Sequence, residues 1–309
     1  MTAVVWSLDE VSVEPSVVTI GNFDGVHRGH HVLLRRTVDT GRDRDLRSVV
    51  VTFEPHPAAV LRPGSEPPRL QTLDDRIEAL AATEVDLVVV LPFTRELSAL
   101  TPREFVERVL VEGLGVARVV VGTNFRFGHR AAGDVVTLVE VGEDHGFETE
   151  AVTLLELGDA AVSSSQIRTA LRVGDVERAA GWLGRPYTLR GTVVRGDGRG
   201  RTIGVPTANL AVDPDVLVPA DGVYAGRVEH GGRRYDAVTN VGVRPTFDGV
   251  TRSIEAHVLD ASPDLYGESL TVAFEARIRG EQRFDGPDEL VARIRLDIEE
   301  ARQVLAARG

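Results

Sequence analysis

The chain has 309 residues, which is more than one average domain and enough for two domains with separate hydrophobic cores. Its formal net charge of −12 argues against a surface that binds nucleic acid, and the absence of cysteine excludes disulfides and a thiol nucleophile. The first residues carry acids and no basic start, and no apolar run approaches about 20 residues, so we expect a cytoplasmic protein with neither a secretory signal nor a membrane span. The sequence leaves the oligomeric state open.

From residue 17 to about residue 185, short β-branched runs alternate with segments of helical pattern. Four runs are almost continuously apolar, as expected for strands that a parallel sheet buries on both faces. They are Val17–Ile20, Val49–Thr52, Leu87–Val90 and Val119–Val121. Leu73–Ala82 and Asp134–His145 are predicted helices, and Thr101 begins another with a capping-box pattern. The alternation predicts a doubly wound, Rossmann-like α/β domain, in which ligands bind beyond the carboxyl ends of the strands.

The segment 21–30, with the sequence GNFDGVHRGH, directly follows the first predicted strand. Its glycines, beginning with Gly21, allow a tight turn, and a helix that begins near His27 directs unpaired N–H groups and its positive dipole end at this turn. His27 and His30 are three residues apart and share one face of that helix. Because the chain contains no lysine, arginine, histidine, hydroxyl groups and backbone N–H groups must hold any phosphate. The segment therefore predicts a phosphate site.

Two other interpretations of His27, His30 and the adjacent His31 remain open. Histidines at this spacing can chelate zinc, although a third ligand is needed and no HExxH-type pattern accompanies them. Alternatively, the segment is an ordinary helix cap with solvated histidines, because short motifs often occur by chance.

Two later segments follow predicted strands and are candidate walls of the same cleft. Residues 54–57 follow the second strand, and residues 122–128 follow a later one. Taken alone, the first is a rigid proline turn, and the second is a glycine-bounded loop whose aromatic residues pack inward.

A serine-rich segment, residues 162–168, opens a further helix that ends near Gly174. On one interpretation Ser164 and Ser165 are ordinary helix caps. On the other, their hydroxyls, the N–H groups of the helix N-terminus and the guanidinium of Arg168 approach one point, which suits the β- and γ-phosphates of ATP.

Short strands dominate the chain after about Pro186. The runs alternate in polarity and are separated by Gly, Pro and Asp turns, which predicts a closed antiparallel β-barrel. They are Thr188–Val194, Val223–Val228, Tyr235–Val241, Ser253–Val258 and Leu270–Ile278. Pro287–Ala307 has amphipathic spacing and is a predicted terminal helix. The change of pattern predicts two domains, residues 1–185 and 186–309.

Two segments of the barrel carry polar groups that could act on a nucleotide. Residues 196–209 are dense in glycine and arginine, but they lack the GxxxxGK[ST] pattern of a P-loop and on composition alone form a flexible hairpin loop. In the strand around Ser253–Asp260, Glu255 alternates with the apolar Ile254, so periodicity alone puts Glu255 on a solvated face.

In this order along the chain, the segments resemble the prokaryotic bifunctional riboflavin kinase and FAD synthetase family. GNFDGVHRGH resembles the signature of its N-terminal HxGH nucleotidylyltransferase domain, and TFEPHP, VGTNFRFG and VSSSQIR resemble its TFxPHP, VGxxFRFG and ISSTxxR segments. In the second half, GVPTAN resembles the GxPTAN motif of riboflavin kinases and IEAHVLD resembles their VExHLxD strand. NVGVRPT and LYG also match in order, so the resemblance covers nearly the whole chain.

For the N-terminal domain, the resemblance implies transfer of the adenylyl group of ATP to FMN, which gives FAD and pyrophosphate. It implies that His27 and His30 are catalytic and that Arg168 receives the pyrophosphate. The implied ATP-binding residues are Gly21, Phe23, Asp24, His27, His30, Ser164, Ser165 and Arg168. The implied flavin-binding residues are Pro55, Pro57, Asn124 and Phe127. Many relatives carry aspartate where Asn124 stands, so we expect Asn124 to act as an amide contact rather than as an acid.

For the barrel, the resemblance implies phosphorylation of riboflavin to FMN. It implies ATP binding by Gly204, Thr207 and Asn209, with Thr207 and Asn209 as ligands of Mg²⁺, and it makes Glu255 the base that takes the proton of the ribityl 5′-hydroxyl. Oxygen ligands of this kind suit a hard cation that keeps several waters. The expected partners are therefore riboflavin, FMN and ATP, with Mg²⁺ as cofactor and with FMN and FAD as intermediate and product.

Two other functions stay open. The barrel could be a non-catalytic flavin sensor beside a working adenylyltransferase, although Thr207, Asn209 and Glu255 are intact. The N-terminal half could adenylylate or cytidylylate a different phosphate ester, against which the TFEPHP and NFRFG segments argue.

Overall fold

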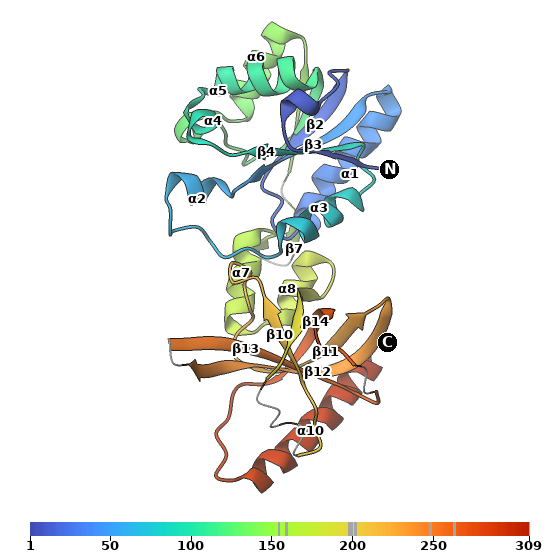
Figure 1. Cartoon of the computed structure of the whole chain (residues 1–309). Coiled ribbons are helices and arrows are strands. Elements are labelled where there is room, and N and C mark those ends of the chain that lie inside the picture. The colour runs from blue at the N-terminus through green and yellow to red at the C-terminus, as the bar shows by residue number, and fades with distance from the viewer. Residues whose placement is uncertain are drawn as a thin grey trace. The chain divides into compact units, whose positions relative to one another are not determined.

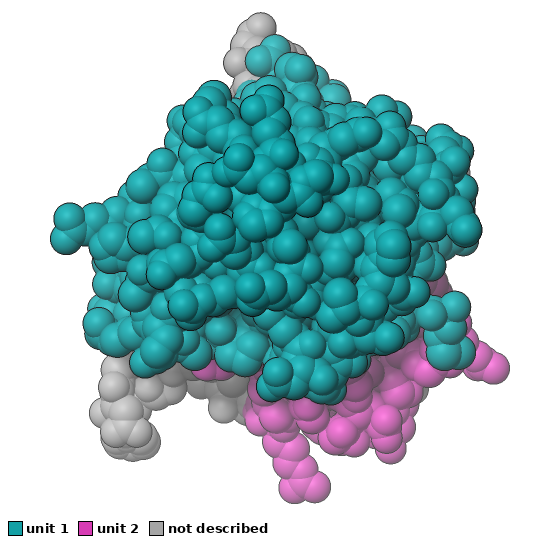
Figure 2. All heavy atoms as spheres, turned by 90° about the horizontal axis from the view of Figure 1, so that it is seen from above, with its two compact units in different colours: residues 1–163 teal, residues 164–309 magenta. Residues whose placement is uncertain are grey.

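The computed structural model describes residues 1–153, 155–157, 160–196, 200, 203–246, 249–261 and 264–308. By packing, the chain divides into two compact units, Met1–Ser163 and Ser164–Gly309, which Figure 1 traces from blue to red and Figure 2 shows in two colours. The boundary predicted near Pro186 lies inside the second unit, after α7 (Ser164–Val173) and α8 (Val176–Leu183). Where the two halves separate as folding units therefore stays a prediction.

A parallel sheet of six strands, in the order β1-β4-β3-β2-β5-β6, forms the centre of the first unit. The strands are β1 (Ala3–Val5), β2 (Ser16–Ile20), β3 (Arg47–Glu54), β4 (Leu87–Pro92), β5 (Val116–Gly122) and β6 (Glu148–Val152). From β2 the chain adds β3 and β4 on one side and β5 and β6 on the other, so the strand order reverses between β2 and β5. In doubly wound sheets, ligands bind beyond the carboxyl ends of the strands at such a reversal.

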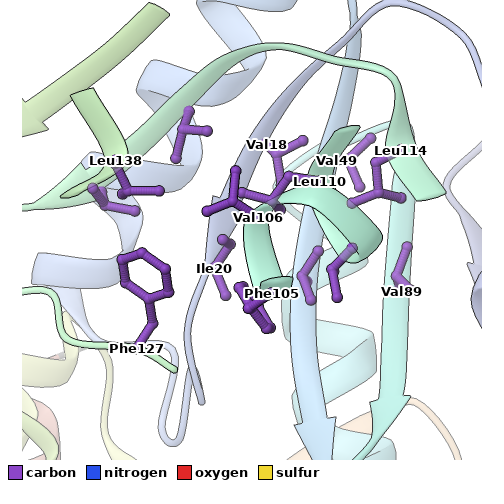
Figure 3. Packing of buried hydrophobic residues seen from close by; sticks show 14 of the residues in the cluster. Val18, Ile20, Val49, Val89, Phe105, Val106, Leu110, Leu114, Phe127 and Leu138 are labelled. Atoms are coloured by element: carbon purple, nitrogen blue, oxygen red, sulfur yellow. The ribbon is translucent and has the colours of Figure 1, made fainter. Parts of the chain in front are cut away.

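Helices cover both faces of this sheet (Figure 1). On one face lie α1 (Arg28–Arg44) and α3 (Leu73–Ala81), where Val50 and Val88 of the sheet pack against Leu34 and Leu80. On the other face lie α5 (Pro102–Phe105), the π-helix η2 (Val106–Glu112) and α6 (Val135–His145). Figure 3 shows the strand residues of that second core, among them Val18, Val49 and Val89, beside residues of these helices. The predicted burial of the strands on both faces is confirmed.

Local signals fix several helix ends in this unit. Thr101 and Glu104 form the predicted capping box at the start of α5, and Asp134 caps α6. Gly146 ends α6 with φ of 77°, a conformation that favours glycine. The remaining elements are η1 (Leu8–Glu10), α2 (Pro57–Leu61), α4 (Arg95–Ala99), η3 (His129–Ala131), β7 (Glu156–Leu157) and β8 (Ala160–Ala161).

The second unit begins with α7 and α8 and continues as a closed antiparallel barrel in the order β10-β13-β12-β11-β14-β9. The strands are β9 (Tyr187–Val194), β10 (Ala208–Val212), β11 (Gly222–His230), β12 (Arg233–Thr246), β13 (Gly249–Val258) and β14 (Ser269–Arg279). The predicted barrel is therefore confirmed.

The helix α10 (Pro287–Ala306) ends the second unit and packs against β11, β12 and β14 (Figure 1). Ala301 and Leu305 of this helix share a buried cluster with Val223 and Val238 of the barrel. Among the described residues, no helix of either unit combines the length and apolar composition needed to cross a bilayer.

Candidate functional site

The histidine segment 21–30 forms a tight turn between β2 and α1. Phe23, Gly25 and Val26 take positive φ angles of 49°, 86° and 37°. This conformation is strained for the β-branched Val26, which is 0% exposed, so the surrounding core must hold it in place. The turn sets His27 at the N-cap of α1, where its Nδ1 accepts the His30 N–H at 3.2 Å.

The two histidine rings of the motif lie against each other. The rings of His27 and His30 stack with centroids 3.6 Å apart, and Phe23 meets His30 edge to face at 5.0 Å. Removal from water, followed by the nearby rings of His27 and His31, holds the pKa of His30 well below its usual value, so His30 is neutral at pH 7. Within the described residues, Nδ1 of His30 is buried without a hydrogen-bond partner. A neutral imidazole beside a helix N-terminus can donate a hydrogen bond to a phosphate.

Gly29 makes room for the ring of His27. A Cβ atom at Gly29 would lie 3.2 Å from Nδ1 of His27 and 3.4 Å from the carbonyl oxygen of Val162. A larger residue at this position would therefore displace the histidine that caps α1.

Phe23 and Asp24, both predicted to bind ATP, are buried in the turn. Phe23 is 1% exposed and supports the ring of His30. Asp24 is 6% exposed, and its two carboxylate oxygens accept the Leu70 N–H at 2.9 and 3.1 Å. Asp24 therefore ties the turn to the segment before α3, and its contact with ATP stays a prediction.

The zinc interpretation of the histidine segment finds no support. In the described part of the chain, no group of three or more His, Cys, Asp or Glu side chains could hold a metal ion. Within that part of the chain, His27 and His30 have no third protein ligand of the kind that a zinc site requires.

A cavity of about 430 Å³ opens beside the same turn, at the reversal of the strand order. Gly21 and Asn22 line it from the end of β2, and Asn124 lines it from the loop after β5. Of the predicted flavin-binding residues, Pro57, Asn124 and Phe127 line the cavity, whereas Pro55 does not. The walls are largely apolar and include five aromatic residues, Phe53, Phe93, Phe105, Phe125 and Phe127. A flat aromatic ligand suits such walls.

A buried arginine that no sequence pattern predicted, Arg76, binds the backbone of two residues that line this cavity. Arg76 of α3 is 6% exposed and donates to the carbonyl oxygens of Asn22 and Phe53, each at 3.1 Å, and to the carboxylate of Glu54 at 2.8 Å. Burial lowers the pKa of Arg76, and Glu54 opposes that shift. Because Asn22 follows β2 and Glu54 ends β3, Arg76 joins the ends of two strands that flank the cavity.

The serine-rich segment belongs to the second unit. Ser164 and Ser165 begin α7, and Arg168, which is 6% exposed, lies one turn later. Since the histidine turn lies in the first unit, the predicted meeting of these residues with His27 and His30 stays a prediction.

In the barrel, the predicted kinase residues lie together where β10 begins. The hydroxyl of Thr207 donates to a carboxylate oxygen of Glu255 at 3.3 Å. Asn209 of β10 lies directly opposite Glu255 of β13, and Asn240 of β12 lies opposite Glu255 on its other side. Side chains of directly opposed strand residues share one face of the sheet, so these polar groups form one row.

A second cavity, of about 400 Å³, is lined by Thr207 but not by Asn209, Glu255 or Asn240. Thr207 lines it together with apolar residues such as Val193 and Ala256, and with Asp264 and Tyr266. Gly204 precedes Thr207 with φ of 79°, as expected for a glycine turn. Part of the predicted nucleotide loop, residues 197–199 and 201–202, lies outside the described residues.

Two protein families match the chain. The FAD synthetase family matches residues 9–166, and the riboflavin kinase family matches residues 183–305. The first match contains the histidine turn and the 430 Å³ cavity, and the second contains Thr207, Asn209 and Glu255.

Several proteins resemble the chain over almost its full length. The bifunctional riboflavin kinase/FMN adenylyltransferase of Escherichia coli K12 is 40% identical over 298 residues, which cover 96% of this chain and 95% of that protein. The corresponding protein of Pseudomonas fluorescens is 41% identical over 292 residues, 94% of this chain and 93% of that protein. A crystal structure from Streptococcus pneumoniae, described as a macrolide-efflux protein, superposes with a TM-score of 0.89 at 33% identity and covers 97% of this chain and 98% of its own. The chain belongs to the family of bifunctional riboflavin kinases and FMN adenylyltransferases, with the FAD synthetase domain before the riboflavin kinase domain.

Proposed function

We propose that the 430 Å³ cavity is the site of FMN adenylylation and that the polar row around Glu255 is the site of riboflavin phosphorylation. The observation that carries this proposal is that, in each unit, part of a segment suited to one half-reaction lines a cavity. Gly21 of the histidine turn and Asn124 share the first cavity, and Thr207, hydrogen-bonded to Glu255, lines the second.

In the kinase reaction, Glu255 accepts the proton of the ribityl 5′-hydroxyl while the oxygen attacks the γ-phosphorus of ATP in line. ADP leaves and FMN is formed. The position of Glu255 supports this role, because Thr207 and Asn209, which hold the nucleotide, adjoin it on the β10 side. The cavity beside Thr207 has room and apolar surface for the base of ATP.

The donors present at this row fit Mg²⁺. The hydroxyl of Thr207 and the amide oxygen of Asn209 are oxygen ligands, and the remaining positions of a magnesium ion are usually filled by waters and substrate phosphates. When bound, the ion would neutralise charge that develops on the β- and γ-phosphates. Thr207 and Asn209 would then orient the nucleotide relative to Glu255.

In the adenylylation reaction, a phosphate oxygen of FMN attacks the α-phosphorus of a second ATP and pyrophosphate leaves. The attacking phosphate is already a nucleophile, so no general base and no covalent enzyme intermediate are needed. His27, His30 and the N–H groups at the start of α1 stabilise the charge that develops on the transferred group. The aromatic walls of the 430 Å³ cavity hold the isoalloxazine ring, and Ser164, Ser165 and Arg168 receive the pyrophosphate.

Incubation of the protein with riboflavin, ATP and Mg²⁺, followed by chromatography of the flavins, tests both reactions. We expect FMN first and FAD later, and chelation of Mg²⁺ with EDTA should stop FMN formation. An ATP analogue with a methylene bridge between the β- and γ-phosphorus should still give FAD from added FMN, because the bond between the α- and β-phosphates stays cleavable. The same analogue should give no FMN from riboflavin.

Each alternative function has its own outcome in this assay. If riboflavin stays unchanged while added FMN becomes FAD, the barrel is a non-catalytic flavin-binding domain. If added FMN also stays unchanged, the adenylylation proposal falls too.

A further inference from the structure

The chain leaves the barrel sheet just before the residues proposed to hold the nucleotide. β10 pairs with β13 only at Ala208 opposite Ala256 and at Asn209 opposite Glu255. One step further along this register, Thr207 would face His257, but β10 has already ended. Something other than the strand ladder must therefore hold Thr207 against β13.

The ring of His257 makes that connection. Its Nδ1 lies 2.7 Å from the carbonyl oxygen of Pro206, the residue before Thr207. A carbonyl oxygen only accepts hydrogen bonds, so Nδ1 of His257 carries the proton and donates. Proline has no N–H group, and Pro206 can therefore join β13 through its carbonyl oxygen alone.

His257 and Glu255 stand on the same face of β13, since they are two residues apart in a strand. The Pro206–Thr207 segment thus contacts β13 twice in succession, through the bond from His257 and through the bond from Thr207 to Glu255. Without the first bond, Thr207 would follow closely after Gly204, a glycine with φ of 79°. A Cβ atom added at Gly204 would meet no other atom within 4 Å, so this part of the loop has open space around it.

We propose that His257 is a positioning residue for riboflavin phosphorylation. Its hydrogen bond to Pro206 sets the distance between Thr207, which orients the nucleotide, and Glu255, which takes the proton of the hydroxyl. His257 acts through the backbone and does not touch the reacting atoms. This inference rests on the proposed kinase function of the barrel.

A second histidine of the barrel offers a matched control. His230, at the end of β11, is half-buried like His257, and its Nδ1 lies 3.3 Å from the carbonyl oxygen of Ser269. It makes the same kind of contact between a ring and a backbone carbonyl, but it joins β11 to β14 and not the loop of Thr207.

The test compares His257→Ala, His257→Asn and His257→Gln with His230→Ala in the full chain. The amide nitrogen of Asn can replace Nδ1–H, whereas the amide of Gln lies one methylene further out. We expect His257→Ala and His257→Gln to lower kcat/KM for riboflavin phosphorylation by about 10–100-fold, the range reached when a reacting group is displaced by up to 1 Å. The loss should include a raised KM for ATP, and His257→Asn should recover activity to within about threefold of wild type, well above the Ala variant.

Circular dichroism gives the Tm of each variant and shows whether its barrel is folded, and the control for the first unit is FMN adenylylation measured on the same samples. It should stay at the wild-type level in all variants, and His230→Ala should keep both activities. Wild-type kinetics in His257→Ala would overturn the inference, and so would a His257→Asn variant as inactive as His257→Ala, because the ring would then act in chemistry rather than as a donor. A wild-type protein that makes no FMN would instead overturn the kinase proposal itself.

Discussion

The hydroxyl of Thr207 reaches the carboxylate of Glu255 at 3.3 Å, although the two residues are 48 positions apart in the sequence. Barrel closure brings them together, because β10 and β13 are neighbours in the sheet but not in the chain. The bond sets the orientation of the Glu255 carboxylate relative to Thr207.

Replacement of this carboxylate should separate the two activities. Glu255→Gln keeps the shape and a hydrogen-bonding group but cannot accept the proton, so FMN formation should slow by about 10²–10⁴-fold, the usual contribution of a positioned base. Conversion of added FMN to FAD should stay almost intact. Glu229→Gln, a change at an exposed strand position of β11, serves as the control and should leave both rates unchanged. Near-normal phosphorylation by Glu255→Gln would make Glu255 an ordinary surface carboxylate.

The opposite separation is expected for the histidine turn. His27→Ala removes both the N-cap of α1 and the ring stacked on His30, so FAD formation from FMN should nearly stop while riboflavin is still phosphorylated and FMN accumulates. Chromatography of the flavins over time measures both steps in one experiment. His145→Ala, at the end of α6, should not change either rate. If His27→Ala abolishes both activities together, the defect lies in folding or in a shared site.

The neutral state of His30 should make stability depend on pH. In the unfolded chain a histidine takes up a proton below about pH 6.5, whereas the low pKa of His30 keeps it neutral in the folded protein. Below about pH 6.5 the unfolded state then binds more protons than the folded state. The contribution of neutral His30 to the free energy of unfolding is therefore fully present above about pH 6.5 and is lost as the pH falls, by up to about 1.4 kcal/mol per pH unit. The loss levels off once the folded protein also protonates His30.

Urea unfolding of wild type and His30→Gln at a series of pH values between 5 and 7.5 measures this effect. The free energy of unfolding should fall more steeply toward acid in the wild type than in the variant. Proton NMR of the imidazole ring gives an independent measurement, and titration of His30 in the folded protein near pH 6.5 would contradict the prediction.

Arg76 should matter for the shape of the flavin cavity as well as for stability. Arg76→Ala removes the donor to Glu54 and to the carbonyl oxygens of Asn22 and Phe53, although Arg69 still donates to Glu54 and Thr52 to Asn22, so the loss should be about 1–3 kcal/mol. Arg76→Lys keeps the charge but cannot reach three acceptors in the same geometry, so we expect a folded protein with a raised KM for FMN and unchanged riboflavin phosphorylation. Arg42→Ala removes an exposed ion pair with Glu84 and should leave these properties unaltered. An unchanged KM for FMN in Arg76→Lys would show that Arg76 only stabilises the fold.

Sequence patterns predicted the helices and strands that are marked by a local signal, such as an apolar run or a helix cap. The central strands are apolar on both faces, and the capping box of Thr101 and Glu104 fixes the start of α5. The two edge strands of the parallel sheet were not predicted. The strand β1 has only 3 residues, which is too short for a clear pattern. The strand β6 contains the polar Glu148 and Glu150, whose ion pairs with Arg118 of β5 form only in the folded protein. The π-helix η2 extends a helix that the sequence predicts, but no local signal marks its different hydrogen bonding.

The candidate sites, too, could be predicted only where a local motif marks their residues. Short motifs predicted Gly21, Asn124 and Phe127 as site residues. The fold brings the loop of Gly21 and the loop of Asn124 and Phe127 to one cavity. Arg76 and His257 were not predicted to hold these sites, because their partners are backbone carbonyls that become neighbours only in the folded chain. An arginine in a predicted helix is usually solvated, and only the ends of β2 and β3 give Arg76 its acceptors.

The helices α7 and α8 pack against the barrel. Arg277 of β14 donates to the carbonyl oxygens of Val173 and Asp221 at 2.9 and 2.8 Å, and the Ala220 N–H donates to Leu171. Trp182 of α8 is 4% exposed, and α8 packs on β9 and β14. A fragment of residues 187–309 would lose this cover, whereas a fragment of residues 164–309 would keep it.

Both fragments should phosphorylate riboflavin and neither should make FAD, because each keeps Thr207, Asn209, Glu255 and α10 but lacks the histidine turn. The shorter fragment should be less stable by about 2–3 kcal/mol, the effect of exposing one large buried side chain, which corresponds to a Tm lower by roughly 10 °C. Circular dichroism gives the Tm of each fragment, and the flavin assay gives its activity. Equal Tm values would mean that α7 and α8 add nothing to the barrel. A folded 164–309 fragment that cannot phosphorylate riboflavin would mean that the kinase site needs groups from the first unit, since every residue proposed for the reaction is present in that fragment.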